Sequence, residues 1–199
     1  MKKLTFIFLL MSSLLGSAQN QVFDDWFIAG GFNAINSLGT QNPFASPGDW
    51  AFQTPFTLAG EKQFARDWTI ELAFNINGWN EGKRLDNGSA PTPPTEGPIA
   101  TDDFGYFSVD TNAKWYFGRQ IFRRGYDKID FYANAGLGFF TIDDTNIAVN
   151  FGGGALFWLN EENTFGIRLQ LIGKFAFNNA DSGFDNNHYQ WGLHGIWRL

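Results

Sequence analysis

The feature that most constrains this chain is a two-residue alternation of apolar and polar side chains, repeated in successive runs from residue 69 to the C-terminus. Successive side chains of a β-strand point to opposite faces of the sheet, so each run predicts a strand with one apolar face. Each run also offers the ~9–11 residues that a tilted strand needs to cross a bilayer. The apolar face is carried by every second residue of 70–76, 107–117, 129–139, 147–159, 165–177 and 189–199.

None of these apolar-face positions is charged, whereas the opposite faces hold charged residues beside many Asn, Gly, Thr and Gln. The alternatives, a soluble barrel or sandwich, would put their apolar residues inside and their charges outside. The apolar faces here are too long and too free of polar interruption for a half-buried sheet. Glycine and ion-pairing groups instead suit the narrow polar interior of a small membrane barrel.

Two further strands are predicted near the N-terminus from weaker patterns. Residues 26–36 are apolar at both odd and even positions, so the sequence does not assign which of their side chains face outward. Residues 52–65 alternate around Leu58, with Glu61 on the other parity. The predicted fold class is therefore all-β, an eight-stranded antiparallel up-and-down transmembrane β-barrel.

The first eighteen residues have the three parts of an export signal. Lys2 and Lys3 supply the positive charge, residues 4–15 form the apolar core, and 16–18 are the small residues before a cleavage site. An anchor helix is the alternative, but this apolar core is shorter than the ~20 residues of a bilayer span. We therefore expect a cleaved signal peptide at 1–18 and a single outer-membrane barrel domain at 19–199.

Composition excludes several kinds of site and partner. The chain has no cysteine, so acylation on cysteine, a disulfide and a thiolate metal site are impossible. Its formal net charge is −6, and losing Lys2 and Lys3 with the signal would make it −8. An acidic chain without a basic run is a poor candidate for binding nucleic acid.

The connections between the predicted strands indicate an orientation, because outer-membrane barrels have short periplasmic turns and longer external loops. With both termini periplasmic, the Pro-, Gly-, Asn- and Asp-rich connections become external and the tight ones periplasmic. Two connections disagree with the rule, a very short external one and a long periplasmic one. The external connections are 37–51, 80–105, 143–144 and 178–187, and the periplasmic ones are 66–67, 118–128 and 160–163.

Charged residues on the inner faces predict an ion-paired lumen, since an eight-stranded barrel is about filled by its side chains and buried charges must be paired. Glu71 and Lys114 lie on neighbouring predicted strands, so we expect them to approach each other. A plug that satisfies buried charge is favoured over a gate for small ions. The predicted lumen residues are Glu71, Asp110, Lys114, Asp130, Arg168, Lys174 and Arg198.

Tryptophans near the strand ends predict two interfacial girdles, where amphipathic rings lie at the level of the lipid headgroups. An ordinary core tryptophan is the alternative for any one of them. The predicted girdle residues are Trp26, Trp68, Trp79, Trp115, Trp158 and Trp197.

No catalytic, cofactor or metal site is predicted. An acyl hydrolase would need a nucleophilic serine beside a base, but His194 has no serine at matching depth on its strand, and Ser108 lies near the external end of its own. Acidic residues at 143–144 and 181–186 match no EF-hand spacing, so we interpret them as solvated loop tips. Gly152–Gly154 falls in mid-strand, where glycine permits curvature.

Four segments, 107–117, 131–138, 152–159 and 187–190, match the pattern of a known family. In these segments the sequence resembles the N-terminal β-barrel domain of OmpA-family outer-membrane proteins of the Bacteroidetes type. The resemblance implies a structural or anchoring role, sometimes with weak pore activity. The sequence ends at Leu199 directly after the last predicted strand, so we expect no periplasmic peptidoglycan-binding domain. That final Leu also replaces the Phe common at barrel C-termini.

Three functions are weighed for such a barrel. The first is a non-enzymatic structural role in envelope integrity, and the second is a binding module that uses the long external loops, above all 80–105. The third is docking onto a larger outer-membrane protein complex through the outer face. The expected partners are outer-membrane lipid and the barrel-insertion machinery, which would read the apolar end at Trp197 and Leu199.

Overall fold

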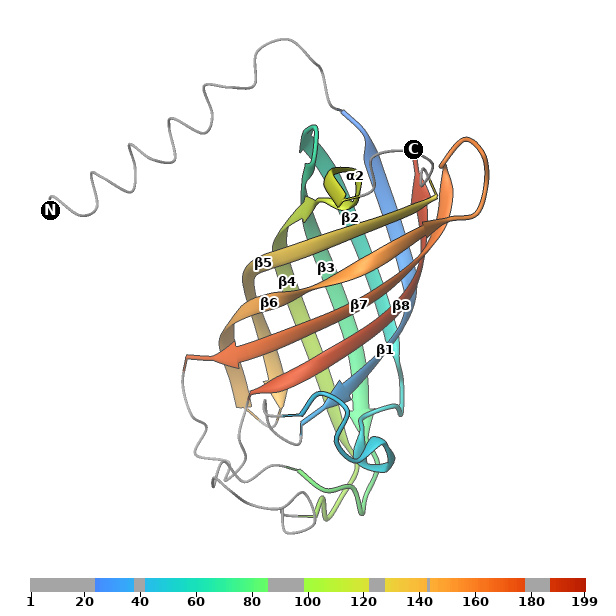
Figure 1. Ribbon diagram of the computed structural model, residues 1–199. Coiled ribbons are helices and arrows are strands. Elements are labelled where there is room, and N and C mark those ends of the chain that lie inside the picture. The colour runs from blue at the N-terminus through green and yellow to red at the C-terminus, as the bar shows by residue number, and fades with distance from the viewer. Residues whose placement is uncertain (1–23, 38–41, 86–98, 122–127, 143, 178–186) are drawn as a thin grey trace, which may run out of the picture.

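Eight antiparallel strands close into one barrel within the residues that the computed structural model describes, which are 24–37, 42–85, 99–121, 128–142, 144–177 and 187–199. Each strand pairs with its neighbours in sequence, and β8 pairs with β1 to close the barrel (Figure 1). The predicted up-and-down fold class is confirmed. The strands are β1 (Trp26–Asn36), β2 (Phe56–Ala65), β3 (Trp68–Trp79), β4 (Phe104–Tyr116), β5 (Ile129–Ile142), β6 (Asp144–Trp158), β7 (Phe165–Ala176) and β8 (His188–Arg198).

The barrel is apolar outside and polar inside, as the alternation predicts. On β3, Ile70 and Leu72 are 47 % and 44 % exposed, whereas Glu71 between them is 2 % exposed. The two weaker strands follow the same rule, because Ile28 and Leu58 face outward and Glu61 faces inward. The pattern of β1 is ambiguous in sequence because small and apolar residues also face inward there, among them Ala29 and Ile35.

The two ends of the barrel differ in their connections. The start of β1 and the C-terminus lie at one end of the barrel, together with the tight β2–β3 turn and the short helix α2 (Gly118–Ile121) (Figure 1). The opposite end carries the long β1–β2, β3–β4 and β7–β8 connections and the one-residue β5–β6 connection; in the first of these, 42–55 contains the 3-10 turn η1 (Pro47–Asp49). We call these the terminal end and the loop end. The predicted signal peptide 1–18, residues 86–98 and the acidic segment 181–186 lie outside the described residues.

Two apolar clusters also lie in the lumen, one toward the loop end and one that reaches from the terminal end along the wall beside the polar side chains. Toward the loop end, Trp79 stacks on Phe104 with ring centroids 4.9 Å apart, in a cluster with Tyr106 and Phe140. Toward the terminal end, Ala29, Leu156 and Ile196 form a second cluster. Among the described residues, no helix is long and apolar enough to cross a membrane.

Candidate functional site: the polar lumen

A cluster of four buried charges spans the lumen in its terminal half. Its members are Glu61 of β2, Glu71 of β3, Lys114 of β4 and Arg168 of β7, each 0–2 % exposed. Lys114 Nζ lies 3.1 Å from Glu61 Oε2 and also binds Glu71 Oε2. Arg168 places Nη1 2.8 Å from Glu71 Oε2 and Nη2 2.6 Å from Glu61 Oε2. Each carboxylate therefore binds both cations. We call this the four-charge cluster.

Hydroxyl groups complete the coordination of Glu61. Thr69 Oγ1 and the Tyr116 hydroxyl donate to Glu61 Oε1 at 2.7 Å and 2.8 Å. The ring of Tyr132 lies beside both cations, with its centroid 5.0 Å from Lys114 Nζ and 5.6 Å from Arg168 Cζ. Charge-assisted hydrogen bonds and cation–π contacts are strongest where water is excluded, as in this lumen. The cluster thus offsets much of the cost of burying its charges.

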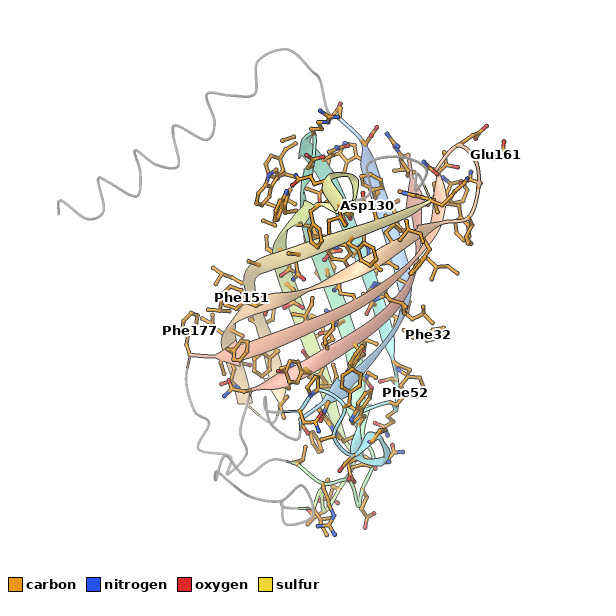
Figure 2. The ribbon with its side chains drawn as sticks, in the orientation of Figure 1. Phe32, Phe52, Asp130, Phe151, Glu161 and Phe177 are labelled. Atoms are coloured by element: carbon orange, nitrogen blue, oxygen red, sulfur yellow. The ribbon has the colours of Figure 1, made fainter. Side chains whose placement is uncertain are left out.

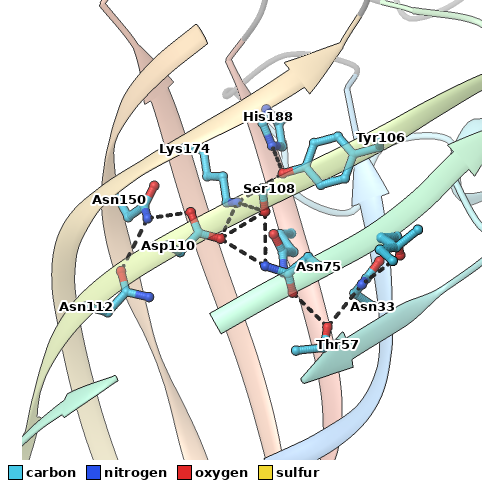
Figure 3. A network of polar contacts seen from close by, with 12 residues as sticks. Asn33, Thr57, Asn75, Tyr106, Ser108, Asp110, Asn112, Asn150, Lys174 and His188 are labelled. Carbon is cyan, nitrogen blue, oxygen red and sulfur yellow. Dashed lines mark hydrogen bonds and ion pairs between the residues drawn. The ribbon is translucent and has the colours of Figure 1, made fainter. Parts of the chain in front are cut away.

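A second cluster, nearer the loop end, is built on Asp110 and Lys174 (Figure 3). Lys174 Nζ lies 2.7 Å from Asp110 Oδ2 and donates to Ser108 Oγ at 2.8 Å and to the Tyr106 hydroxyl at 3.0 Å. Asn75 Nδ2 and Asn150 Nδ2 each donate to the Asp110 carboxylate at 2.9 Å. We call this the Asp110–Lys174 cluster.

Neutral side chains extend the Asp110–Lys174 cluster toward the opposite wall (Figure 3). Thr57 Oγ1 donates to Asn75 Oδ1 at 2.7 Å, and Asn33 Nδ2 donates to Thr57 Oγ1 at 3.0 Å. On the other side, the Tyr106 hydroxyl lies 3.0 Å from Nε2 of His188. The hydrogen-bonded layer therefore joins β1, β2, β3, β4, β6, β7 and β8 across the lumen.

Glycines on the inner face make room for the large polar side chains. Asp110 pairs with Gly138, and Tyr132 pairs with Gly154 on the neighbouring strand. A Cβ added at Gly138 would clash with the Asp110 carboxylate, and one at Gly154 would lie 2.5 Å from the Tyr132 hydroxyl oxygen. The glycine-rich inner face is thus a packing requirement of the polar side chains opposite it.

Between the two clusters lies a cavity of about 10 Å³, lined by groups from both clusters. Asn112 Nδ2, Gln190 Oε1 and both ring nitrogens of His194 line it and have no hydrogen-bond partner among the described residues. A space of this size holds about one water molecule. It is too small for a hydrated ion to pass.

The structure brings five of the predicted lumen residues into two clusters and places the other two elsewhere. Glu71 and Lys114 meet as neighbours, with Arg168 beside them. Asp110 and Lys174 form a separate pair, so the single predicted network is divided in two. Sequence reasoning left out Glu61, although it had the inward parity, because the pattern of its strand was weak.

Asp130 and Arg198 share the inward parity but lie outside both clusters, which corrects the prediction. The Asp130 carboxylate accepts the backbone N–H groups of Gly118 and Phe131, each at 3.0 Å, and so holds the start of α2. Arg198 is 38 % exposed and pairs with Asp25. Both residues lie near the strand ends at the terminal end, where charges do not need a partner across the lumen.

The predicted tryptophan girdle is only partly on the outer wall. Trp79 is fully buried in the lumen, and Trp158 faces inward, with its ring centroid 6.4 Å from that of Phe27. The prediction was therefore wrong for these two residues. The others are exposed and gather at the terminal end, where Trp68 stacks on Trp115 at 6.2 Å. The four predicted girdle residues that face outward are Trp26, Trp68, Trp115 and Trp197.

Comparison with solved structures identifies the architecture. The barrel is similar to the N-terminal β-barrel domain of Pseudomonas aeruginosa OprF, with a TM-score of 0.50 and 11 % identity over 88 % of this chain and 97 % of that one. This chain has the fold of an eight-stranded outer-membrane β-barrel. The same outer-membrane barrel fold is found in Ail, the attachment invasion locus protein of Yersinia pestis, with a TM-score of 0.50 and 16 % identity over 88 % and 99 % of the two chains. No family model and no curated protein matches the sequence.

Proposed function

We propose that this protein is an integral, non-enzymatic outer-membrane barrel of the OmpA type found in Bacteroidetes, with a structural role in the envelope. In this proposal the lumen is a plug, and both termini are periplasmic. The observation that carries the proposal is the four-charge cluster, in which Glu61 and Glu71 each bind both Lys114 and Arg168 across the lumen.

The energetics of buried charge support a plug over a pore. A route for ions would have to separate carboxylates from cations that have no access to bulk water, and removing one partner of a buried pair costs about 3–5 kcal/mol. The apolar clusters toward both ends of the lumen, one containing Trp79 and the other Leu156, add further barriers. A lumen closed in this way serves to stabilise the barrel wall.

The outer wall and the connections support the membrane placement and the orientation. The exposed aliphatic and aromatic side chains cover a wall that only lipid would solvate well. The tight β2–β3 turn lies at the terminal end, and the long β1–β2, β3–β4 and β7–β8 connections lie at the loop end, which is the pattern of periplasmic turns and external loops. The one-residue β5–β6 connection at the loop end and the longer β4–β5 connection at the terminal end are the two exceptions to this pattern.

Planar-bilayer recording of the purified protein tests the plug. We expect no steady conductance from the native protein, and none from Lys62→Ala, whose surface pair with Asp24 lies outside the lumen. Lys114→Ala should leave the bilayer silent as well, because the end clusters remain. Discrete, reproducible openings of the native protein would refute the plug.

Deletion of the gene tests the envelope role. We expect the deleted strain to become more sensitive to detergent, and the full chain to restore resistance. Normal resistance in the deleted strain would argue against the structural role. Co-purification in mild detergent tests the proposal that the outer face docks onto a larger outer-membrane complex. Pull-down with the β8 segment as bait tests whether the barrel-insertion machinery recognises that segment.

A second candidate function, a binding module at the loop end, is favoured by contacts between two long connections. Gln53 Nε2 donates to Asp103 Oδ2 at 3.0 Å, and the Arg84 backbone N–H donates to Asp49 Oδ1 at 3.2 Å. These contacts join the two connections through residues that flank 86–98 in the sequence. Replacing 86–98 with a short turn should abolish ligand or surface binding and leave detergent resistance intact if this function holds.

A further inference from the structure

The segment 42–52 at the loop end folds back onto the outer wall of the barrel. Trp191, on the outward face of β8, donates its indole N–H to the Pro43 carbonyl at 3.0 Å. The ring of Phe44 lies 5.0 Å from the Trp191 ring, and Trp50 stacks on it at 6.2 Å with an interplanar angle of 10°. Backbone hydrogen bonds between Ala51 and Ile35 fix the segment to the end of β1. It is thus an ordered addition to the wall.

The same segment has an apolar side and a polar side. Phe44 and Phe52 are 65 % and 62 % exposed, and Figure 2 shows Phe52 on the same side of the barrel as Phe32 of the β1 wall. Asp49 is the only charged residue in 42–52, and its carboxylate is turned toward the neighbouring connection at Arg84. The only charged side chain of the segment therefore points away from the exposed Phe44 and Phe52 rings.

We propose that 42–52 is an interfacial anchor whose Phe44 and Phe52 rings insert into the outer leaflet, at the boundary between acyl chains and headgroups. The inference rests on the proposed function, because it needs the β8 and β1 wall to face lipid. The wall supplies the argument for lipid: the segment is packed on Trp191, whose outward neighbour on the same strand is Leu193, 48 % exposed.

The depth of the anchor follows from its irregular backbone. A lipid-exposed loop cannot lie within the hydrocarbon, where its unpaired N–H and C=O groups would have no partner. Aromatic rings, by contrast, are favoured at headgroup level. The segment 42–52 therefore marks the outer boundary of the hydrocarbon layer on the β8–β1 side.

Site-directed spin labelling tests the anchor, because the chain has no native cysteine to label. Phe44→Cys and Phe52→Cys would each carry a nitroxide in phospholipid vesicles. Collision rates with oxygen, which enriches in lipid, and with a nickel chelate, which stays in water, report the depth. The matched controls are Leu193→Cys on the wall and Asp102→Cys on an exposed part of the connection 80–103.

We expect the oxygen-to-nickel collision ratio at 44 and 52 to exceed that at 102 several-fold and to approach that at 193. A ratio at 44 and 52 equal to that at 102, with 193 still in lipid, would overturn the anchor and leave the proposed function standing. A water-like ratio at 193 would overturn the proposed function itself. Spin–spin broadening at 44 that grows with the protein-to-lipid ratio would assign the surface to a second copy and also overturn the anchor. Heat-modifiable gel migration confirms folding of each variant.

Discussion

Asp110 lies directly opposite Gly138 in the barrel wall, and its carboxylate occupies the space that a side chain at position 138 would fill. Asp110 needs a residue without a side chain at position 138. The carboxylate must reach Lys174 and Asn150 from this place, so any atom at 138 would displace it from its partners. A glycine on β5 is thereby part of the lumen's electrostatics.

Gly138→Ala should destabilise the barrel by about 1–3 kcal/mol, the range for overpacking a filled interior. The added methyl group would displace Asp110 or Asn150, because the polar ends of these two side chains are the atoms nearest to it. Urea unfolding of the reconstituted protein would measure the loss. Gly60→Ala is the matched control, since no atom lies within 4 Å of the added Cβ, and an equal effect of both changes would contradict the packing argument.

Lys114→Met should lower the free energy of unfolding by about 3–5 kcal/mol, because it leaves the buried pair of carboxylates with one cation. Lys62→Met, at the surface pair with Asp24, should change it by no more than about 1 kcal/mol. The same urea titration serves for both. Adding Glu71→Gln to Lys114→Met should recover part of the loss, and a further equal loss would disprove the charge-pair account.

The two lumen clusters should be energetically independent. Lys114→Met and Lys174→Met should add to within about 0.5 kcal/mol, since they share no partner. Lys114→Met and Arg168→Met should not add, because both remove a cation from Glu61 and Glu71. Double-mutant cycles measure the coupling, and strong coupling between Lys114 and Lys174 would restore the single network predicted from sequence.

Trp191→Ala should loosen the segment 42–52 without unfolding the barrel. Hydrogen exchange at the Ala51 amide, which donates to the Ile35 carbonyl at 2.9 Å, should become several-fold faster as the stacked rings are lost. Amides in the middle of β8 should keep their protection. Trp197→Ala, at the terminal end of the same strand, is the control and should leave exchange at Ala51 unchanged.

The sequence predicts the barrel well because the side of the sheet to which a side chain points is set by its position along its own strand. The alternation at Ile70, Glu71 and Leu72 is sufficient to assign inside and outside on β3. The same parity rule places Trp79 with Glu71 in the lumen, and its position at a strand end is what led to its prediction as an interfacial residue. The lesson is that parity is a stronger signal than proximity to a strand end.

Which lumen residues meet is harder to predict, because contacts across the barrel depend on its tilt and closure. Arg168 lies on β7 and its partner Glu61 lies on β2, and these two strands are not neighbours in the barrel. Parity places Asp130 on the same inner face as Arg168 but does not give its depth. The pairing of Glu71 with Lys114 is predictable from sequence because it joins adjacent strands.

The contacts of Arg168 with Glu61 and Glu71 join residues 107 and 97 positions apart in the chain. They can form only when the N-terminal and C-terminal strands come together, so an open, half-inserted sheet would hold both carboxylates with Lys114 as their only cation. Contacts of such long range form late and are slow to reach. Arg168 thus stabilises the closed barrel through contacts that an open sheet lacks. We therefore expect assembly in the membrane to be closer to all-or-none, because intermediates that stop short of joining β8 to β1 would keep an unbalanced charge.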